Sequence, residues 1–417
     1  MRHKIEVANL KIGMYVAELD RPWVGSPFLF QGFEIESDED LAKLREACKF
    51  VYVDDLQSSV TVTGAVSEPA RTAAPASSVT ITSRGGDAAA ARPPVFGGHS
   101  ELKVITKTLA VAHMTIVHTM DELRMGKSID SQESKAVVQQ LVKHVSTNPN
   151  SMLWLTSLQQ KHEHTARHCL NVSILAIAFG RHLNLSDEDL NLLGLGAVLH
   201  DVGKMRIPKE ILDKPGKLTE EEYARIRNHA NDGHTVLKLA RNIPEPALAI
   251  VRSHHERVDG KGYPDGLQGD AVPRLARVVA LADAYDMLTG DYPFRTAIPP
   301  ADALRILRTE GADEFGADLV QEFIKCLGIY PVGSLVQVGS GALGIVMASN
   351  PSARLKPLLM MVRDENGQTL KPRTLMNLAL LPDDKASNEK WNIQSVVDPK
   401  KYNIDVAAIV AEEVQMS

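Results

Sequence analysis

Titratable side chains interrupt several otherwise apolar segments of this chain, and they restrict how those segments can be arranged. The stretch AVLHDVGK at 197–204 places His200 and Asp201 at the end of a run of small and apolar residues. Ser186, with Asp189 three residues later, is typical of the start of a helix that would run up to this pair. A histidine at a helix C-terminus can also simply cap the helix dipole, so this pair alone does not establish a site.

Other groups of the same kind lie on separate segments with helical periodicity. Together the groups suited to metals are His168, His200, Asp201, His229, His254, His255 and Asp283. Each would be costly to bury without a partner, whereas a metal would give each lone pair one. Five histidines and two aspartates exceed the ligands of one tetrahedral ion. They suit two ions with one carboxylate between them, so we expect the fold to bring these segments together.

The motifs HDVGK at 200–204 and HHERVDGKGYPDGLQGD at 254–270 resemble those of the HD-GYP domain, a branch of the HD metallophosphohydrolases. The resemblance covers roughly residues 155–327 and implies an all-α HD-type helical catalytic domain. It implies that the seven residues above are the metal ligands, that Asp201 is catalytic as the metal bridge, and that Lys204 is catalytic and faces the substrate phosphate. Lys204 also follows Asp201 by about one helical turn, which independently places it on the same face.

The activity that the resemblance implies is metal-dependent hydrolysis of cyclic di-GMP to linear pGpG, with GMP as a further product left open. Two divalent transition metal ions would activate a hydroxide for attack on phosphorus. His and carboxylate ligands suit Fe, Mn, Ni or Zn without choosing among them. The alternatives are a weakly active or non-catalytic sensor or docking module for cyclic dinucleotides, and an HD phosphohydrolase acting on pGpG or other nucleotides.

The GYP loop consists of Gly262, Tyr263 and Pro264. Tyr263 could stack on a base or bind a phosphate, or it could only hold the loop in place. The family resemblance also makes this loop a candidate docking surface for diguanylate cyclase domains. Cyclic di-GMP and pGpG are therefore the expected ligands, and a homodimer is left open.

Several positions depart from the family pattern or extend it. His164 stands where some members have a glutamate that helps to hold a third metal; it could bind a metal, support a ligand, or be an ordinary helix histidine. Asp286, three residues after Asp283, could bind a metal but is expected to support a ligand or the helix. In TGDYPFR, Tyr292 replaces an arginine that grips nucleotide phosphates and Arg295 is kept, and both are expected near the substrate. Because a bidentate donor is lost, we expect linear pGpG to be handled at least as well as the cyclic form.

The rest of the chain predicts a multidomain protein whose helical catalytic domain is flanked by small β-rich segments. The expected parts are a small β-rich N-terminal domain (1–56), a flexible linker rich in Ala, Ser and Pro (57–97), a helical connector (98–150), the HD-GYP domain (151–330), and a small β-rich C-terminal segment and tail (331–417). The linker cannot bury enough apolar surface to offset its ordering entropy. The N-terminal segment resembles a domain that often precedes HD-GYP in bacteria.

Charge and hydropathy limit where the protein acts. A net charge of −6 argues against non-specific nucleic-acid binding. No apolar run approaches the roughly 18 residues of a membrane helix, and the N-terminus lacks the apolar region of a signal peptide. Three cysteines, far apart and without metal-like spacing, suggest a reducing compartment. We therefore expect a cytoplasmic protein with no membrane span and no nucleic-acid partner.

Overall fold

The computed structural model describes residues 2–20, 33–35, 37–54, 58, 60, 99–127, 131–156, 164–212, 214, 216–240, 242–292, 296–350 and 352–416. Of the expected linker 57–97, only Ser58 and Val60 fall within these ranges, and Arg295 lies outside them. Within the described ranges, no helix combines the length and the apolar character needed to span a bilayer.

The N-terminal part is a small antiparallel sheet with the strand order β1–β4–β2–β3. Its strands are β1 (Arg2–Glu6), β2 (Tyr15–Leu19), β3 (Phe33–Glu34) and β4 (Phe50–Asp54). Helix α1 (Asp38–Ala47) packs on the same core and was missed by the sequence analysis. It begins with a capping box, in which Ser37 Oγ accepts from Asp40 N at 3.2 Å and Asp40 Oδ2 accepts from Ser37 N at 3.0 Å.

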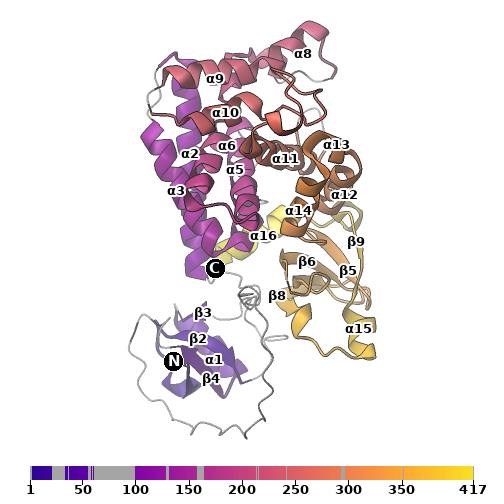
Figure 1. Cartoon of the computed structure of the whole chain (residues 1–417). Coiled ribbons are helices and arrows are strands. Elements are labelled where there is room, and N and C mark those ends of the chain that lie inside the picture. The colour runs from indigo at the N-terminus through magenta and orange to yellow at the C-terminus, as the bar shows by residue number, and fades with distance from the viewer. Residues whose placement is uncertain are drawn as a thin grey trace, which may run out of the picture.

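The middle of the chain is an assembly of helices (Figure 1). The helices before the HDVGK motif are α2 (His99–Arg124), α3 (Ser131–Thr147), α4 (Pro149–Thr156), α5 (His164–His182) and α6 (Asp187–Leu199). Those after it are the short 3₁₀ helix η2 (Val202–Arg206), α7 (Lys209–Leu212), α8 (Glu220–Arg227), α9 (His229–Leu239), α10 (Glu245–Ser253), α11 (Arg274–Thr289), α12 (Pro300–Glu310), α13 (Ala312–Phe315) and α14 (Ala317–Leu327). The expected helical connector therefore corresponds to α2 and α3.

Helix α6 lies at the centre of this assembly, where α3, α5, α10 and α11 all contact it. Ser186 caps its start, since the Ser186 Oγ accepts from Asp189 N at 3.1 Å as the sequence predicted. Gly196 allows the close approach of α10, because an added Cβ there would lie 2.5 Å from Ile250 Cδ1. The HDVGK motif at the end of α6 is thereby held in the interior of the domain.

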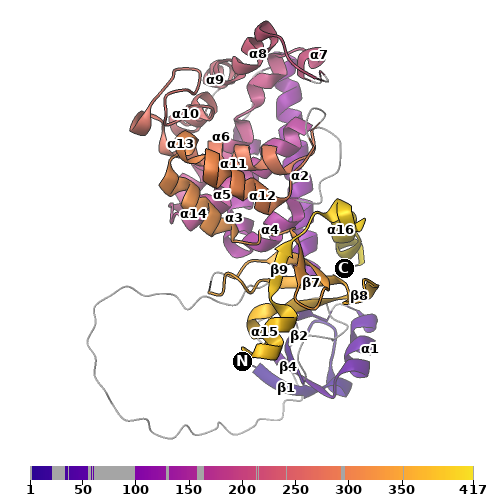
Figure 2. The ribbon, with the colours of Figure 1, turned by 90° about the vertical axis from the view of Figure 1, so that its right-hand side faces the viewer.

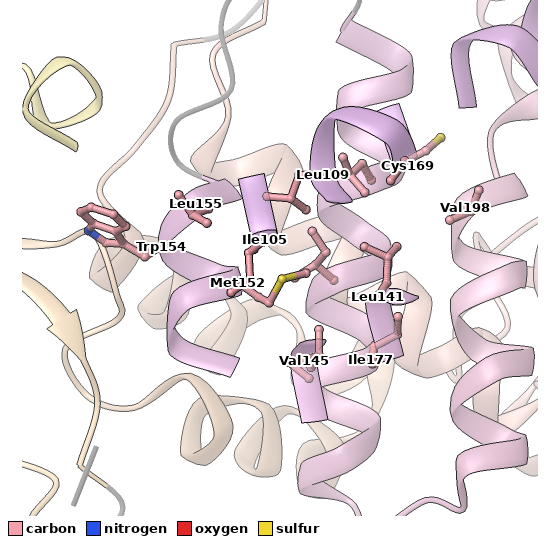
Figure 3. Packing of buried hydrophobic residues seen from close by; sticks show 14 of the residues in the cluster. Ile105, Leu109, Leu141, Val145, Met152, Trp154, Leu155, Cys169, Ile177 and Val198 are labelled. Atoms are coloured by element: carbon pink, nitrogen blue, oxygen red, sulfur yellow. The ribbon is translucent and has the colours of Figure 1, made fainter. Parts of the chain in front are cut away.

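One cluster of buried apolar side chains joins the helices to the C-terminal sheet. Figure 3 shows its helical part, which includes Ile105, Leu109, Leu141, Val145, Met152, Trp154, Ile177 and Val198. The same cluster continues through Ile345 and Met360 of the sheet. The C-terminal segment thus shares one core with the helices through one set of side chains, while a second set, which includes Val336, Val346 and Leu359, forms a core of its own.

The C-terminal segment is a five-stranded antiparallel sheet with the order β8–β7–β6–β5–β9, adjoining the helices (Figure 2). Its strands are β5 (Leu335–Val338), β6 (Leu343–Ala348), β7 (Leu358–Arg363), β8 (Thr369–Asn377) and β9 (Ile393–Val396). The predicted hairpin at the ENG step joins β7 to β8, with Gly367 at φ +77°. The weakly patterned tail also contains α15 (Lys385–Trp391) and α16 (Val406–Met416), and Arg373 of β8 pairs with Glu412 of α16 at 2.6 Å.

Candidate metal centre and adjoining cavity

The predicted metal ligands converge from separate helices to one place in the helical domain. His168 lies on α5, His200 ends α6, Asp201 precedes η2, His229 begins α9, His254 and His255 follow α10, and Asp283 lies on α11. All of them are buried except His255, which is partly buried. Residues separated by more than a hundred positions in sequence thus lie close enough together to bind the same ion.

Their donor atoms form two groups, one of His168, His200 and Asp283 and one of His229, His254 and His255. Within each group the donor atoms lie within 4.8 Å of one another. Asp201 lies between the groups. Its Oδ2 is 3.7 Å from His168 Nε2 and 3.5 Å from His200 Nε2, whereas its Oδ1 is 3.3 Å from His229 Nε2. One carboxylate therefore offers one oxygen to each group, an arrangement that suits a bridging ligand.

Three of the histidine rings are fixed by backbone carbonyls. The Nδ1 atoms of His200, His229 and His254 donate to the carbonyl oxygens of Ala197, Ile226 and Val251 at 2.7, 2.7 and 2.8 Å. Since a carbonyl only accepts, Nδ1 carries the proton and Nε2 keeps a lone pair. The buried Nε2 of His200 has no hydrogen-bond partner among the described residues. A cation would satisfy this atom, so the donor set fits a metal.

The fourth ring, that of His168, is held by Asp286. Asp286 Oδ2 accepts from His168 Nδ1 at 2.7 Å and from the Tyr292 hydroxyl at 3.1 Å, and its Oδ1 accepts from Asn171 Nδ2 at 3.0 Å. A carboxylate behind a ligand histidine fixes the orientation of the ring. This geometry favours the supporting role of Asp286 over direct ligation, and it reveals a partner, Asn171, that the sequence analysis did not single out.

Protonation states follow from burial and from these carboxylates. Burial lowers the pKa of His200, His254 and His255, that of His255 to about 3, so these rings are neutral. Burial acts in the same direction on His168, but its hydrogen bonds to Asp283 and Asp286 raise its pKa to about 10. This ring therefore holds a second proton on Nε2 when no ion is bound, and a metal would displace that proton. Burial would raise the pKa of Asp201, yet the Lys204 charge and the neighbouring histidines hold it well below its usual range.

Lys204 lies where its spacing predicted. Its Nζ is 2.6 Å from Asp201 Oδ2, one turn along η2. Burial would lower the pKa of Lys204, but the Asp201 carboxylate raises it, so the side chain is a cation beside the ligands.

The GYP loop is anchored by Glu256, whose role the sequence analysis missed. This side chain is 1% exposed, and its two carboxylate oxygens accept from the backbone N–H groups of Asp265 at 2.6 Å and Leu267 at 2.9 Å. The Tyr263 ring stacks on His255, with centroids 4.6 Å apart and planes at 27°. The Arg227 guanidinium covers the same ring at 4.6 Å. These contacts favour the alternative in which Tyr263 holds the loop in place, and they pack its ring against the imidazole of His255.

A cavity of about 960 Å³ opens beside His168 and Asp201. Its cations come from three parts of the chain, namely Arg124 of α2, Lys204 of η2, and Lys209, Lys214 and Lys217 on the segment that leads to α8. Its volume lies at the upper end of the usual range for small-molecule sites. Tyr292 lines this cavity, whereas Tyr263 is not among the described residues that do. The side chain of His164 and all of Arg295 lie outside the described part of the chain.

Comparisons with known proteins assign two parts of the chain to family models. A model of the HD domain matches residues 150–319, and a domain of unknown function, DUF3391, matches residues 2–134. The cyclic di-GMP phosphodiesterase PA4108 of Pseudomonas aeruginosa is 32% identical over 385 residues, which cover 91% of this chain and 89% of that protein. The chain belongs to the HD-GYP family of cyclic di-GMP phosphodiesterases.

Other relatives of this HD-GYP protein align over a smaller part of it. The cyclic di-GMP phosphodiesterase response regulator RpfG of Xanthomonas campestris is 39% identical over 156 residues, covering 37% of this chain and 41% of that protein. The 3′3′-cGAMP-specific phosphodiesterase 3 of Vibrio cholerae is 35% identical over 172 residues, covering 41% and 37%. Among solved structures, Bd1817 of Bdellovibrio bacteriovorus shares 16% identity at a TM-score of 0.44, covering 78% of this HD-GYP chain and 98% of that chain.

Proposed function

We propose that this protein hydrolyses cyclic di-GMP to linear pGpG at a dinuclear metal centre. The observation that carries the proposal is the pair of donor groups that share Asp201 at the wall of a cation-lined cavity. The name of PA4108, which aligns over most of both chains, supports the same substrate.

The donor set divides naturally between two ions. His168, His200 and Asp283 would hold one, His229, His254 and His255 would hold the other, and Asp201 would contact both. These nitrogen and carboxylate ligands suit Fe, Mn, Ni or Zn. When bound, such ions lower the pKa of a water molecule and polarise a phosphoryl oxygen. A third ion at His164 remains a prediction from the sequence.

The protein's own groups bind and orient the substrate. Lys204 is a cation 2.6 Å from the bridging carboxylate and lines the cavity, so it is placed to bind a phosphate oxygen of the bond that is cleaved. His168 is oriented by Asp286, and His255 is covered by Tyr263. These contacts hold the ligand atoms in position while the substrate enters from the cavity.

Finer parts of the proposal rest on the family resemblance. They are GMP as a further product, docking of diguanylate cyclase domains on the GYP loop, a homodimer, and a cytoplasmic location. The three cysteines, Cys48, Cys169 and Cys326, form no disulfide with one another, which is in keeping with a reducing compartment.

The test is turnover by anaerobically purified protein together with its metal content. Cyclic di-GMP, 3′3′-cGAMP, pGpG and GTP are offered separately, and products are resolved by chromatography. We expect about two transition metals per chain, as the two donor groups require, and conversion of cyclic di-GMP to pGpG. Binding without hydrolysis at full metal content would favour the sensor, hydrolysis of pGpG or GTP alone would favour the nucleotide phosphohydrolase, and metal at background levels would contradict the dinuclear centre.

A further inference from the structure

Helix α2 lies outside the residues matched by the HD-domain model, yet it forms one wall of the cavity beside the metal ligands. It falls within the match to DUF3391, which ends at residue 134, whereas the HD-domain match begins at residue 150. Val117, Met120, Asp121 and Arg124 of α2 line the cavity together with His168, Asp201 and Lys204. The helix reaches this position because it packs against η2, which carries Lys204.

The Arg124 guanidinium lies against η2 and is only weakly engaged there. Its Nη2 contacts Met205 Sδ at 3.3 Å, at the residue that follows Lys204. Its Nη1 lies 2.9 Å from Asp121 Oδ1, and these two side chains are 46% and 51% exposed. A thioether is a weak acceptor, and an exposed ion pair contributes little. The remaining N–H donors are therefore available to an anion in the cavity.

Other cations of the cavity add to this positive charge. Lys209 and Lys217 are exposed and have no ion-pair partner within the described residues. Lys214, by contrast, is bound by the Glu222 carboxylate at 2.6 and 2.8 Å. The cavity thus offers Arg124, Lys209 and Lys217 to a ligand in addition to Lys204.

A cyclic dinucleotide carries two phosphodiester groups, and the metal ligands can receive only the one that is cleaved. The other is desolvated in the same cavity and needs a donor of its own. We propose that Arg124 binds this second phosphate, with Lys209 and Lys217 adding attraction. A planar guanidinium suits the role because it can hold two phosphate oxygens at once. The inference rests on the proposed function and assigns a substrate contact to a helix outside the HD-domain match.

The test compares Arg124→Gln and Arg124→Lys with Lys107→Gln, a control on an exposed position of the same helix that does not line the cavity. Binding of cyclic di-GMP, used as its slowly hydrolysed phosphorothioate analogue, and of GMP to the full-length, metal-containing protein is measured at equilibrium. Metal content and thermal midpoint are measured alongside. We expect Arg124→Gln to weaken cyclic di-GMP binding by about 10- to 100-fold and to raise KM more than it lowers kcat. GMP has a single phosphate, so its binding should change little. Arg124→Lys should be intermediate, and the control should match the wild type.

Two results would overturn the inference while the proposed function stands. In the first, the wild type binds and hydrolyses cyclic di-GMP, and the Arg124→Gln variant does both equally well. The other is an equal loss of GMP binding, which would place Arg124 at the metal-proximal phosphate. A wild type that neither binds nor hydrolyses any cyclic dinucleotide would overturn the proposed function and this inference together.

Discussion

The hydroxyl of Tyr292 donates a hydrogen bond to Asp286 at 3.1 Å, on the same oxygen that accepts from the ring of His168. Tyr292 stands where the family resemblance predicts a phosphate-binding arginine. Here it lies behind His168, a candidate metal ligand, and its hydroxyl is 3.2 Å from His168 Nδ1. Position 292 therefore helps to hold a ring of the candidate metal centre in place.

Removing the Asp286 carboxylate should weaken metal binding by the group that contains His168, and leave the group that contains His229 unaffected. We expect Asp286→Ala to lower metal affinity there by roughly 10- to 100-fold, because the ring loses the group that fixes its orientation. Metal titration of chelator-stripped protein should then show one tight and one weak ion. Tyr292→Phe, which removes only one of the hydrogen bonds to Asp286, should have a smaller effect. Two tight ions in Asp286→Ala would show that His168 does not depend on this support.

Tyr292 also bears on the choice between cyclic and linear substrates. Without the family's arginine, we expect kcat/KM for pGpG to be at least as high as that for cyclic di-GMP. The measurement is kcat/KM for both dinucleotides in the wild type and in Tyr292→Arg. A wild type that strongly prefers the cyclic form, with that preference unchanged in Tyr292→Arg, would exclude position 292 as a determinant of selectivity.

The Asp201 carboxylate, the proposed bridge, should be indispensable for metal binding and for hydrolysis. Asp201→Ala leaves two cation sites facing each other without shared negative charge, so both metal content and hydrolysis should be lost. Asp232→Ala is a suitable control, since this carboxylate also lies on a helix of the domain, α9, and among the described residues its ion-pair partner is Arg206, at 3.8 Å. Elemental analysis and turnover of the two variants give the answer. Wild-type turnover with full metal content in Asp201→Ala would refute the assignment of the bridge.

Glu256→Gln should loosen the GYP loop without unfolding the domain. Glutamine has one acceptor oxygen where glutamate has two. One of the two backbone N–H groups that now donate to the carboxylate would therefore face the side-chain NH₂, which is a donor. We expect a loss of about 1–3 kcal/mol locally. Hydrogen exchange at the amides of Asp265 and Leu267 should speed up, whereas the exposed Glu221→Gln should leave it unchanged. Equal protection in both variants would mean that Glu256 does not anchor the loop.

Gly203 of the HDVGK motif should tolerate no side chain. An added Cβ would collide with the carbonyl oxygen of His229 and lie 2.6 Å from Gly233 N, so the backbone itself must move. We expect Gly203→Ala to cost at least about 1–3 kcal/mol of stability and to lower metal content. In Gly180→Ala the nearest atoms are the ends of leucine side chains, which can rotate, so its effect should be milder. Thermal midpoints of the two variants test this order.

The sequence was most informative where function fixes a residue type at a fixed spacing. The candidate metal ligands on or beside α5, α6 and α9–α11 could be predicted because His and Asp are conspicuous in apolar segments. The cap at Ser186 and the ENG hairpin could be predicted because they depend only on residues close together in sequence. Helix α1 was missed although its capping box at Ser37 and Asp40 was visible, because the flanking strands dominated the pattern.

The contacts that remained hidden depend on tertiary packing. Nothing around Arg124 distinguishes it from any surface arginine of a long helix, and only the packing of α2 on η2 brings it to the cavity. Asn171 and Glu256 are similar cases. The partner of Asn171 comes from α11, and the partners of Glu256 come from a loop that folds back on it.

The carbonyls that hold His200, His229 and His254 belong to the last turns of α6, α8 and α10, where the helix leaves its final C=O groups without an internal partner. Each ring therefore has two roles in the proposed centre, because one nitrogen ends a helix and the other is left to bind an ion. An aspartate at these positions could replace the ligand but could not donate to the carbonyl. Exchange of ligand type during evolution or design is consequently restricted by helix termination as much as by metal preference.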